Sequence, residues 1–127
     1  MDRIEELQKL ANYARYLIIE TLINAGVGHP GGSLSSIDVM TALYFNIMNI
    51  DPKNPKWDKR DRFILSKGHS SIGLYTVLYL KDFITKDELM TFRQDRSNLW
   101  GHLDLKTPGV EMSTGSLGHG LSVGVGR

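Results

Sequence analysis

Apolar residues recur at intervals of three and four along the first part of the chain, with polar residues between them. The spaced positions are Ile4, Leu7, Ala11, Ala14, Ile18, Leu22 and Ala25. This period matches the turn of an α-helix and predicts an amphipathic helix with one buried face. Gly26 follows the last apolar position, where glycine readily adopts the left-handed conformation that ends many helices. The pattern therefore predicts a long first helix over residues 4–25.

A second helical pattern follows a loop rich in glycine and proline over residues 27–34. Ser35 and Asp38 have the spacing of a capping box, with aspartate in place of the usual glutamate. We therefore expect a second helix over residues 35–48. Its inward positions are expected to be Ile37, Met40, Tyr44, Ile47 and Met48.

The central part of the chain has the pattern of a strand that leads into a helix. A solvated loop over residues 51–60 precedes a short apolar strand over residues 63–65, and a helical run covers residues 72–80. In open α/β sheets, ligands bind where strands end and helices begin. The polar residues 66–70 are therefore expected to lie at a binding site.

The last third of the chain is expected to be mostly loop. Thr85 and Glu88 have the spacing of a capping box, which predicts a short helix that ends near Phe92. Residues 93–115 show no helical or strand period, and a last helix is predicted to begin near Leu117.

Composition and charge exclude several classes of function. The 127 residues carry 15 Lys and Arg against 14 Asp and Glu, a balance too even for binding to nucleic-acid phosphates. Without cysteine the chain has no disulfide, thiolate nucleophile, zinc–thiolate site or iron–sulfur cluster. No apolar run approaches the roughly 20 residues that cross a bilayer. We therefore expect a cytoplasmic protein that binds neither nucleic acid nor membranes.

The four histidines each follow a glycine in a loop-like context: His29, His69, His102 and His119. Taken singly, each is more simply explained as a loop histidine bonded to the backbone. Four together, with glycines that leave room for a ligand, predict a polar cleft lined by imidazoles. Imidazole exchanges protons and hydrogen bonds near neutral pH, which suits the oxygens of sugar phosphates. The spacing of these histidines does not match helical metal motifs, so we predict no metal ligand among them.

Residues 115–120 form a glycine-rich turn that leads into the last predicted helix. The amides at such a helix start favour an anionic or flat aromatic ligand. Close packing of a helix on a strand would explain the same glycines, and the motif alone does not decide between the two. Because the chain stops inside this helical pattern, we expect it to be a section of a longer protein.

As a set, these segments resemble the N-terminal part of transketolase, a thiamine diphosphate enzyme. The resemblance spans nearly the whole chain and rests on six segments in the family's order: residues 28–32, 51–57, 60–69, 101–102, 108–111 and 114–118. It implies an α/β fold with a parallel sheet flanked by helices. Residues 1–127 would form the first, incomplete part of the diphosphate-binding domain.

The resemblance also implies a role for each candidate residue. His69 matches the histidine that contacts the cofactor diphosphate, and the turn of Gly115, Ser116 and Leu117 matches the residues that line the cofactor rings. His29 and His102 match the histidines that contact the sugar near its reacting carbon. His119 replaces a glutamine common in the family. It would contact the cofactor or substrate, or it would only occupy the helix start.

Cofactors and partners follow from the same resemblance. The family uses thiamine diphosphate with Mg²⁺, whose ligands in a Gly-Asp-Gly segment and a downstream asparagine are expected beyond residue 127. It transfers a two-carbon ketol unit from a ketose phosphate to an aldose phosphate. A C-terminal pyrimidine-binding domain or subunit completes the site, in a dimer or heterotetramer. Residues 1–127 alone are therefore expected to be inactive.

Two other functions remain open from the sequence. One is a non-catalytic truncated paralogue that acts as a binding or assembly module. The other is a different thiamine diphosphate enzyme, such as 1-deoxyxylulose-5-phosphate synthase or a 2-oxo-acid dehydrogenase subunit. Leu103 and Asp104 follow His102 where many transketolases have Pro-Glu, so the sugar substrate also remains open.

Overall fold

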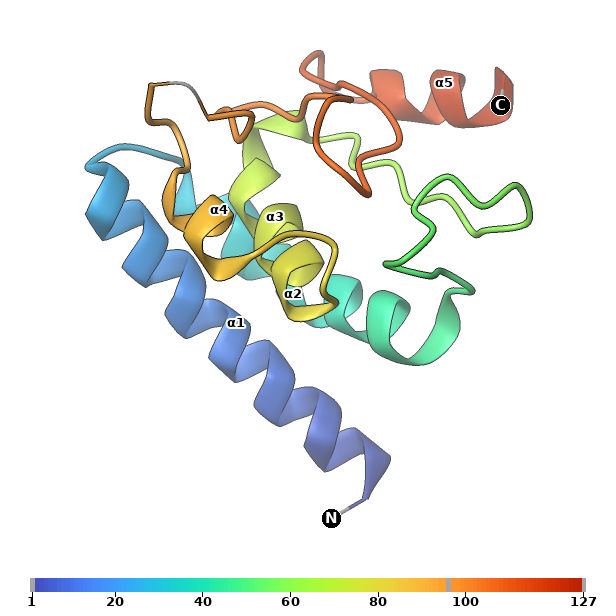
Figure 1. The fold of residues 1–127 in the computed structure, drawn as a ribbon, viewed down its shortest axis with the longest axis horizontal. Coiled ribbons are helices and arrows are strands. Elements are labelled where there is room, and N and C mark those ends of the chain that lie inside the picture. Colours follow the sequence, from blue (N-terminus) through green and yellow to red (C-terminus); the bar gives the residue numbers. More distant parts are fainter. Residues whose placement is uncertain (1, 96, 127) are drawn as a thin grey trace.

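The computed structural model describes residues 2–95 and 97–126, which form a helical assembly connected by long loops (Figure 1). Its elements are α1 (Arg3–Ala25), α2 (Pro30–Ala42), a π-helical turn η1 (Leu43–Ile47), a 3₁₀ turn η2 (Gly68–Ser70), α3 (Ser71–Leu80), α4 (Lys86–Met90) and α5 (His119–Gly126). Helix α1 packs on α2 and α3, and α4 contacts α1 and α3. Within residues 2–95 and 97–126, the helices lack the combined length and hydropathy of a membrane-spanning segment.

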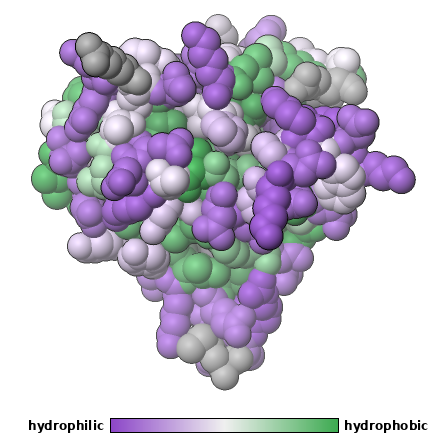
Figure 2. All heavy atoms as spheres, viewed as in Figure 1, coloured by the Kyte–Doolittle hydropathy of each residue, from purple (hydrophilic) through white to green (hydrophobic). Residues whose placement is uncertain are grey.

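The first predicted helix is confirmed together with both of its ends. The Asp2 side chain accepts a hydrogen bond from the Glu5 amide at 2.8 Å and caps the N-terminus of α1. Gly26 adopts a left-handed φ of 73° and ends the helix. The middle of α1 is buried at Ala14 and Ile18, whereas its N-terminal end protrudes beneath a patch of apolar surface (Figure 2).

The predicted start of the second helix at Ser35 is wrong. Helix α2 begins at Pro30, because proline at the first helical position already has the helical φ and lacks an amide that would need a partner. The Ser35 hydroxyl donates to the carbonyl of Gly32 at 3.1 Å instead of capping a helix start. As a result, His29 lies immediately before the first turn of α2.

The predicted strand over residues 63–65 is also not formed. No β-strand occurs within residues 2–95 and 97–126, so the expected parallel sheet is absent from this part of the chain. A strand needs a neighbour with which to exchange backbone hydrogen bonds, and the described residues supply none. The apolar character of the segment instead reflects burial, since Leu65 is 5% exposed.

Helix α3 forms the centre of the core. All eight residues from Ser71 to Leu78 are buried, as expected for a helix covered on every side. The buried position of α3 fixes its N-terminal end, where the candidate site lies.

The two remaining helices are close to their predicted positions. The predicted capping box of Thr85 and Glu88 is present and starts α4. Helix α4 ends at Met90, before the buried Phe92, and α5 begins at His119, two residues after the predicted start near Leu117.

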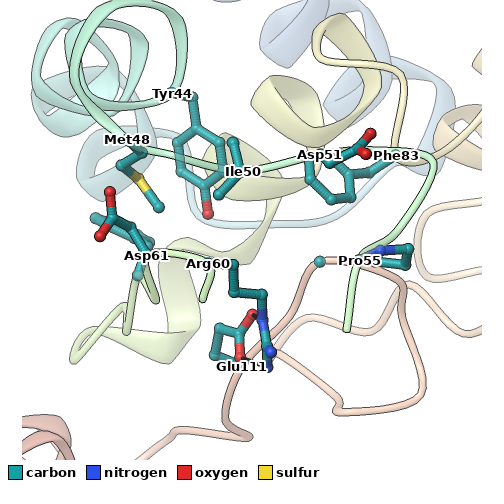
Figure 3. Close-up of a pocket in the computed structure, with 11 residues that line it drawn as sticks. Tyr44, Met48, Ile50, Asp51, Pro55, Arg60, Asp61, Phe83 and Glu111 are labelled. Carbon is teal, nitrogen blue, oxygen red and sulfur yellow. Dashed lines mark hydrogen bonds and ion pairs between the residues drawn. The ribbon is translucent and has the colours of Figure 1, made fainter. Parts of the chain in front are cut away.

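A buried ion pair joins two of the long loops. The Arg60 guanidinium donates from Nε and Nη2 to the two carboxylate oxygens of Glu111, at 2.8 Å and 2.7 Å. Burial and the Glu111 carboxylate raise the pKa of the Tyr44 hydroxyl far above its usual range. Tyr44, Arg60 and Glu111 line a pocket of about 10 Å³ (Figure 3). None of the four histidines belongs to the lining of this pocket. A pocket of this volume has room for about one water molecule, which is too little for a substrate.

Candidate active site

The N-terminal end of α3 is bonded to the loop that carries His102. The Ser71 hydroxyl, in the first turn of α3, lies 3.0 Å from the carbonyl of Trp100 and 2.8 Å from that of Gly101. One turn further along, the Tyr75 hydroxyl donates to the carbonyl of His102 at 3.3 Å. Because His69 belongs to the turn η2 that leads into α3, these bonds bring the His102 loop to the His69 segment.

His29 and His69 lie side by side. Their ring centroids are 5.6 Å apart, and the rings meet edge to face at 82°. The segments that carry them are joined through buried Ser33, whose hydroxyl donates to the carbonyl of Ser70 at 3.2 Å and accepts from the amide of Gly73 at 3.1 Å. The spacing of the two imidazoles therefore rests on bonds inside the core.

The predicted cofactor turn, residues 115–117, begins next to the segment that leads to His69. The Thr114 hydroxyl donates to the carbonyl of Leu65 at 2.6 Å, which anchors the chain just before Gly115. A methyl group added to Gly115 would lie 3.6 Å from Cδ2 of His102, so these two predicted residues are neighbours. The side chains of Ser116 and Leu117 are exposed, with Leu117 73% accessible.

The glycine-rich start of α5 also provides close packing. The Gly120 amide donates to the Ser66 hydroxyl at 3.1 Å, and a methyl group added to Gly120 would lie 2.9 Å from the Cα of Ser66. His119 is exposed at the first position of this helix. The packing interpretation is therefore correct for Gly120, and the role of His119 stays open.

The described part of the site offers accessible backbone on which a flat ligand can lie. Gly115, Ser116 and Leu117 are exposed beside the imidazole of His102, which leaves their backbone accessible. The buried Ser70 hydroxyl, at the N-terminal end of α3, has no hydrogen-bond partner within the described part of the chain. No group of three or more His, Asp or Glu among the described residues could hold a metal ion.

Two residues that shape the site were not predicted from the sequence: Ser33 and Ser71. A third, Lys67, lies in the segment 66–70 that was expected at a binding site, but its bonding partner was not predicted. Ser33 directly follows the glycine pair of residues 31–32, and Ser71 lies two residues after His69. Their positions next to these motifs were the one signal that could have found them. Their bonding partners lie 29 to 40 residues away in the sequence, where no local pattern reveals them.

The profile of the family described as transketolase, thiamine diphosphate binding domain, matches residues 6–127. The chain belongs to this family. It is 46% identical over 124 residues to an apulose-4-phosphate transketolase subunit of Phocaeicola vulgatus, covering 98% of this chain and 44% of that protein. It is 48% identical over 122 residues to the 6-deoxy-6-sulfo-D-fructose transketolase subunit SqwG of Clostridium sp., covering 95% of this chain and 44% of that protein.

Solved transketolase structures share the fold of this chain. The transketolase of Campylobacter jejuni superposes with a TM-score of 0.91 at 39% identity, over 99% of this chain and 20% of that one. The transketolase of Leishmania mexicana gives 0.90 at 36% identity, over 94% and 18%. The expected resemblance to transketolase is thus confirmed. The chain spans less than half the length of the two curated subunits that it matches.

The contact between Gly68 and Thr114 gives a first test of the site. A methyl group added in Gly68→Ala would overlap the backbone carbonyl of Thr114, so the turn at residues 115–117 has to move. We expect the free energy of unfolding to fall by about 1–3 kcal/mol, as for other overpacked sites. We also expect thiamine diphosphate to bind more weakly. Urea unfolding and cofactor titration of the full-length protein measure the two effects.

Gly31→Ala is the matched control for this substitution. A methyl group at Gly31 meets no atom within 4 Å, and the residue lies inside α2, where alanine is favourable. Stability and cofactor affinity should be at least those of the unsubstituted protein. If Gly68→Ala behaved like Gly31→Ala, the close packing of the cofactor turn on residue 68 would be wrong.

Proposed function

We propose that this chain is the N-terminal, diphosphate-binding section of a transketolase that transfers a two-carbon ketol group from a ketose phosphate to an aldose phosphate. The observation that carries the proposal is the grouping of His29, His69, His102 and Gly115 around the N-terminal end of α3. A catalytic site built from loops on a rigid core has this arrangement. Membership of the transketolase family supports it independently.

We propose for each residue the role that the resemblance to transketolase implies. His69 contacts the diphosphate of the cofactor, and the exposed turn of Gly115, Ser116 and Leu117 lines its rings. When bound, thiamine diphosphate supplies the carbanion chemistry that cleaves the carbon–carbon bond. His29 and His102 donate hydrogen bonds to the sugar oxygens and move protons at the reacting carbon's hydroxyl. Both imidazoles are exposed, and His102 adjoins the cofactor turn, so a substrate can reach them.

The remaining parts of the active enzyme come from outside these residues. A diphosphate requires charge compensation by a divalent cation or several basic groups. We therefore assign the Mg²⁺ ligands to residues beyond 127. Two relatives that match most of this chain are named as transketolase subunits. Their names support an enzyme that includes a companion subunit. Our proposal is that the companion binds the cofactor pyrimidine, in a dimeric or heterotetrameric cytoplasmic enzyme.

The proposed function also accounts for the absence of the expected parallel sheet from the described residues. Residues 63–65 are apolar, lie outside the helices and are partly or fully buried, as a central strand would be. We propose that further strands of the complete diphosphate-binding domain pair with them and form the parallel sheet. Residues 66–70 would then lie at the carboxyl end of a strand, where such folds bind their ligands.

Reconstitution of the complete protein with its companion subunit tests the proposed reaction. With thiamine diphosphate and Mg²⁺, xylulose 5-phosphate and ribose 5-phosphate should react, and pyruvate should not. Turnover of pyruvate alone would favour a 1-deoxyxylulose-5-phosphate synthase. Binding to the companion subunit without any turnover, over a panel of ketose phosphates, would favour a non-catalytic assembly module.

His69→Ala tests the cofactor role. We expect it to weaken thiamine diphosphate binding by about 1.5–3 kcal/mol, because one charge-assisted hydrogen bond to the diphosphate is lost. The turnover number at saturating cofactor should change much less. Cofactor titration followed by protein fluorescence gives the dissociation constant. An unchanged constant would refute the assignment of His69.

A further inference from the structure

Lys67 joins the two segments that carry His29 and His69. Its side chain is half-buried, and Nζ donates to the carbonyl of Gly32 at 2.8 Å and to the Ser35 hydroxyl at 3.3 Å. No carboxylate lies within ion-pair distance of Lys67 in the described part of the chain. The ammonium group therefore links residue 67 to the N-terminal part of α2 through neutral oxygen atoms.

The location of this ammonium group is electrostatically unusual. Gly32 lies in the first turn of α2, and the helix dipole disfavours a positive charge at a helix N-terminus. The contact is thus not explained by charge attraction to the helix. The Gly32 carbonyl also accepts from the Ser35 and Ser36 hydroxyls, at 3.1 Å and 2.8 Å, so several donors fix this one backbone atom. Directed hydrogen bonds hold the first turn of α2 in place.

The bond connects the same segments as the imidazole pair. Gly32 is three residues after His29, and Lys67 is two residues before His69, while the two rings lie 5.6 Å apart. We propose that Lys67 is a positioning residue that holds the first turn of α2, and with it the His29 imidazole, in register with His69. This inference rests on the proposed function, in which His29 contacts the sugar.

Loss of the Lys67 bond should loosen the site without unfolding the chain. Ser33 lies on the inner side of the same contact, is 0% exposed and bonds to both Ser70 and Gly73. These inner bonds remain when Lys67 is replaced. The expected change is therefore a small displacement of the exposed His29 ring, and displacements of about 1 Å can reduce turnover by as much as roughly a hundredfold.

Three variants of the complete enzyme with its companion subunit test the inference. Lys67→Met should lower kcat for ketol transfer about ten- to a hundredfold, with the cofactor dissociation constant within about twofold of the unsubstituted value. Lys67→Arg keeps the donor and should recover most of this loss. Lys59→Met removes an exposed lysine and should leave kcat unchanged. The urea midpoint should be the same in all four proteins.

A measurement that needs no turnover separates this inference from the proposed function. In the edge-to-face pair, the ring current of one imidazole shifts the proton resonances of the other. Spectra of the full-length protein with ¹³C-labelled histidine should show these shifts lost in Lys67→Met and kept in Lys67→Arg. Such spectra from a protein without ketol transfer would support the positioning role and refute the proposed function.

Three results would overturn the inference. The first is a Lys67→Met protein with unchanged histidine resonances and unchanged kcat. The second is unchanged histidine resonances with one binding constant raised tenfold. A raised cofactor dissociation constant would make Lys67 a ligand of the cofactor diphosphate, and a raised KM for the sugar phosphate would make it a ligand of that phosphate. The third is a lowered urea midpoint that Lys67→Arg does not restore, which would make its role structural.

Discussion

His102→Ala in the complete enzyme is expected to lower kcat/KM for the sugar donor by roughly 10²–10⁴-fold, the range that a positioned general acid or base contributes. His29→Ala should have an effect of the same kind. Both imidazoles are exposed, and the structure places Gly115 of the cofactor turn next to His102. Steady-state kinetics at saturating cofactor should show a lower kcat and a higher KM for the sugar.

Cofactor affinity decides whether these roles are assigned correctly. Thiamine diphosphate should bind almost equally to His102→Ala, His29→Ala and the unsubstituted enzyme, in contrast to His69→Ala. Gly31→Ala controls for disturbance of the loop that carries His29. Equal loss of cofactor affinity in the His29 or His102 variant would show that substrate and cofactor residues have been exchanged.

Arg60→Met is expected to lower the free energy of unfolding by about 3–5 kcal/mol, the usual cost of removing one partner of a buried ion pair. The side chains of Arg60 and Glu111 are only 10% and 6% exposed, so bulk solvent compensates little for the lost guanidinium (Figure 3). The substitution also removes the bond from Arg60 Nη1 to the carbonyl of Trp57 at 2.9 Å. Urea unfolding of the full-length protein measures the change.

Two further variants identify the cause of this loss. Lys86→Met breaks a pair with Glu20 in which both side chains are more than a third exposed, and it should cost no more than about 1 kcal/mol. Combining Arg60→Met with Glu111→Leu removes both charges and should recover part of the stability. A double variant less stable than Arg60→Met alone would mean that loss of the Arg60–Glu111 attraction is not the main cost.

Helices with clear capping signals were predictable from the sequence. Gly26 ends α1 as expected, and the Thr85–Glu88 capping box starts α4, because these signals act within one turn of the chain. The start of α2 was misassigned because two local signals compete there. Pro30 at the first helical position prevails over the serine five residues later. A rule that gives proline priority would have placed His29 at the helix start.

The predicted strand failed for a different reason. Apolar residues such as Phe63 and Leu65 indicate burial, but a strand also depends on a partner that can lie far away in the sequence. Within residues 2–95 and 97–126 that partner does not occur. Local sequence therefore predicted the burial of this segment and could not predict its hydrogen bonding.

The candidate histidines could be predicted from the sequence because each follows a glycine in a distinct motif. The bonds between their segments could not, since they join positions far apart in the chain: Ser33 reaches Ser70, and Ser71 reaches Gly101. Serine and lysine are common residues, and nothing in their local context marks their partners. The sequence placed Lys67 in an expected binding segment, and three-dimensional contacts were needed to show what it bonds to.

The burial of α3 has a consequence for how the loop that follows His102 can vary. The His102 carbonyl is bonded to Tyr75 and Leu103 is 4% exposed, whereas Leu105 and Lys106, two and three residues further on, face solvent. A fixed inner part and an exposed outer part of one loop thus meet within a few residues. Substitutions at Leu105 or Lys106 can change the surface of the protein while the segment bonded to α3 keeps its shape.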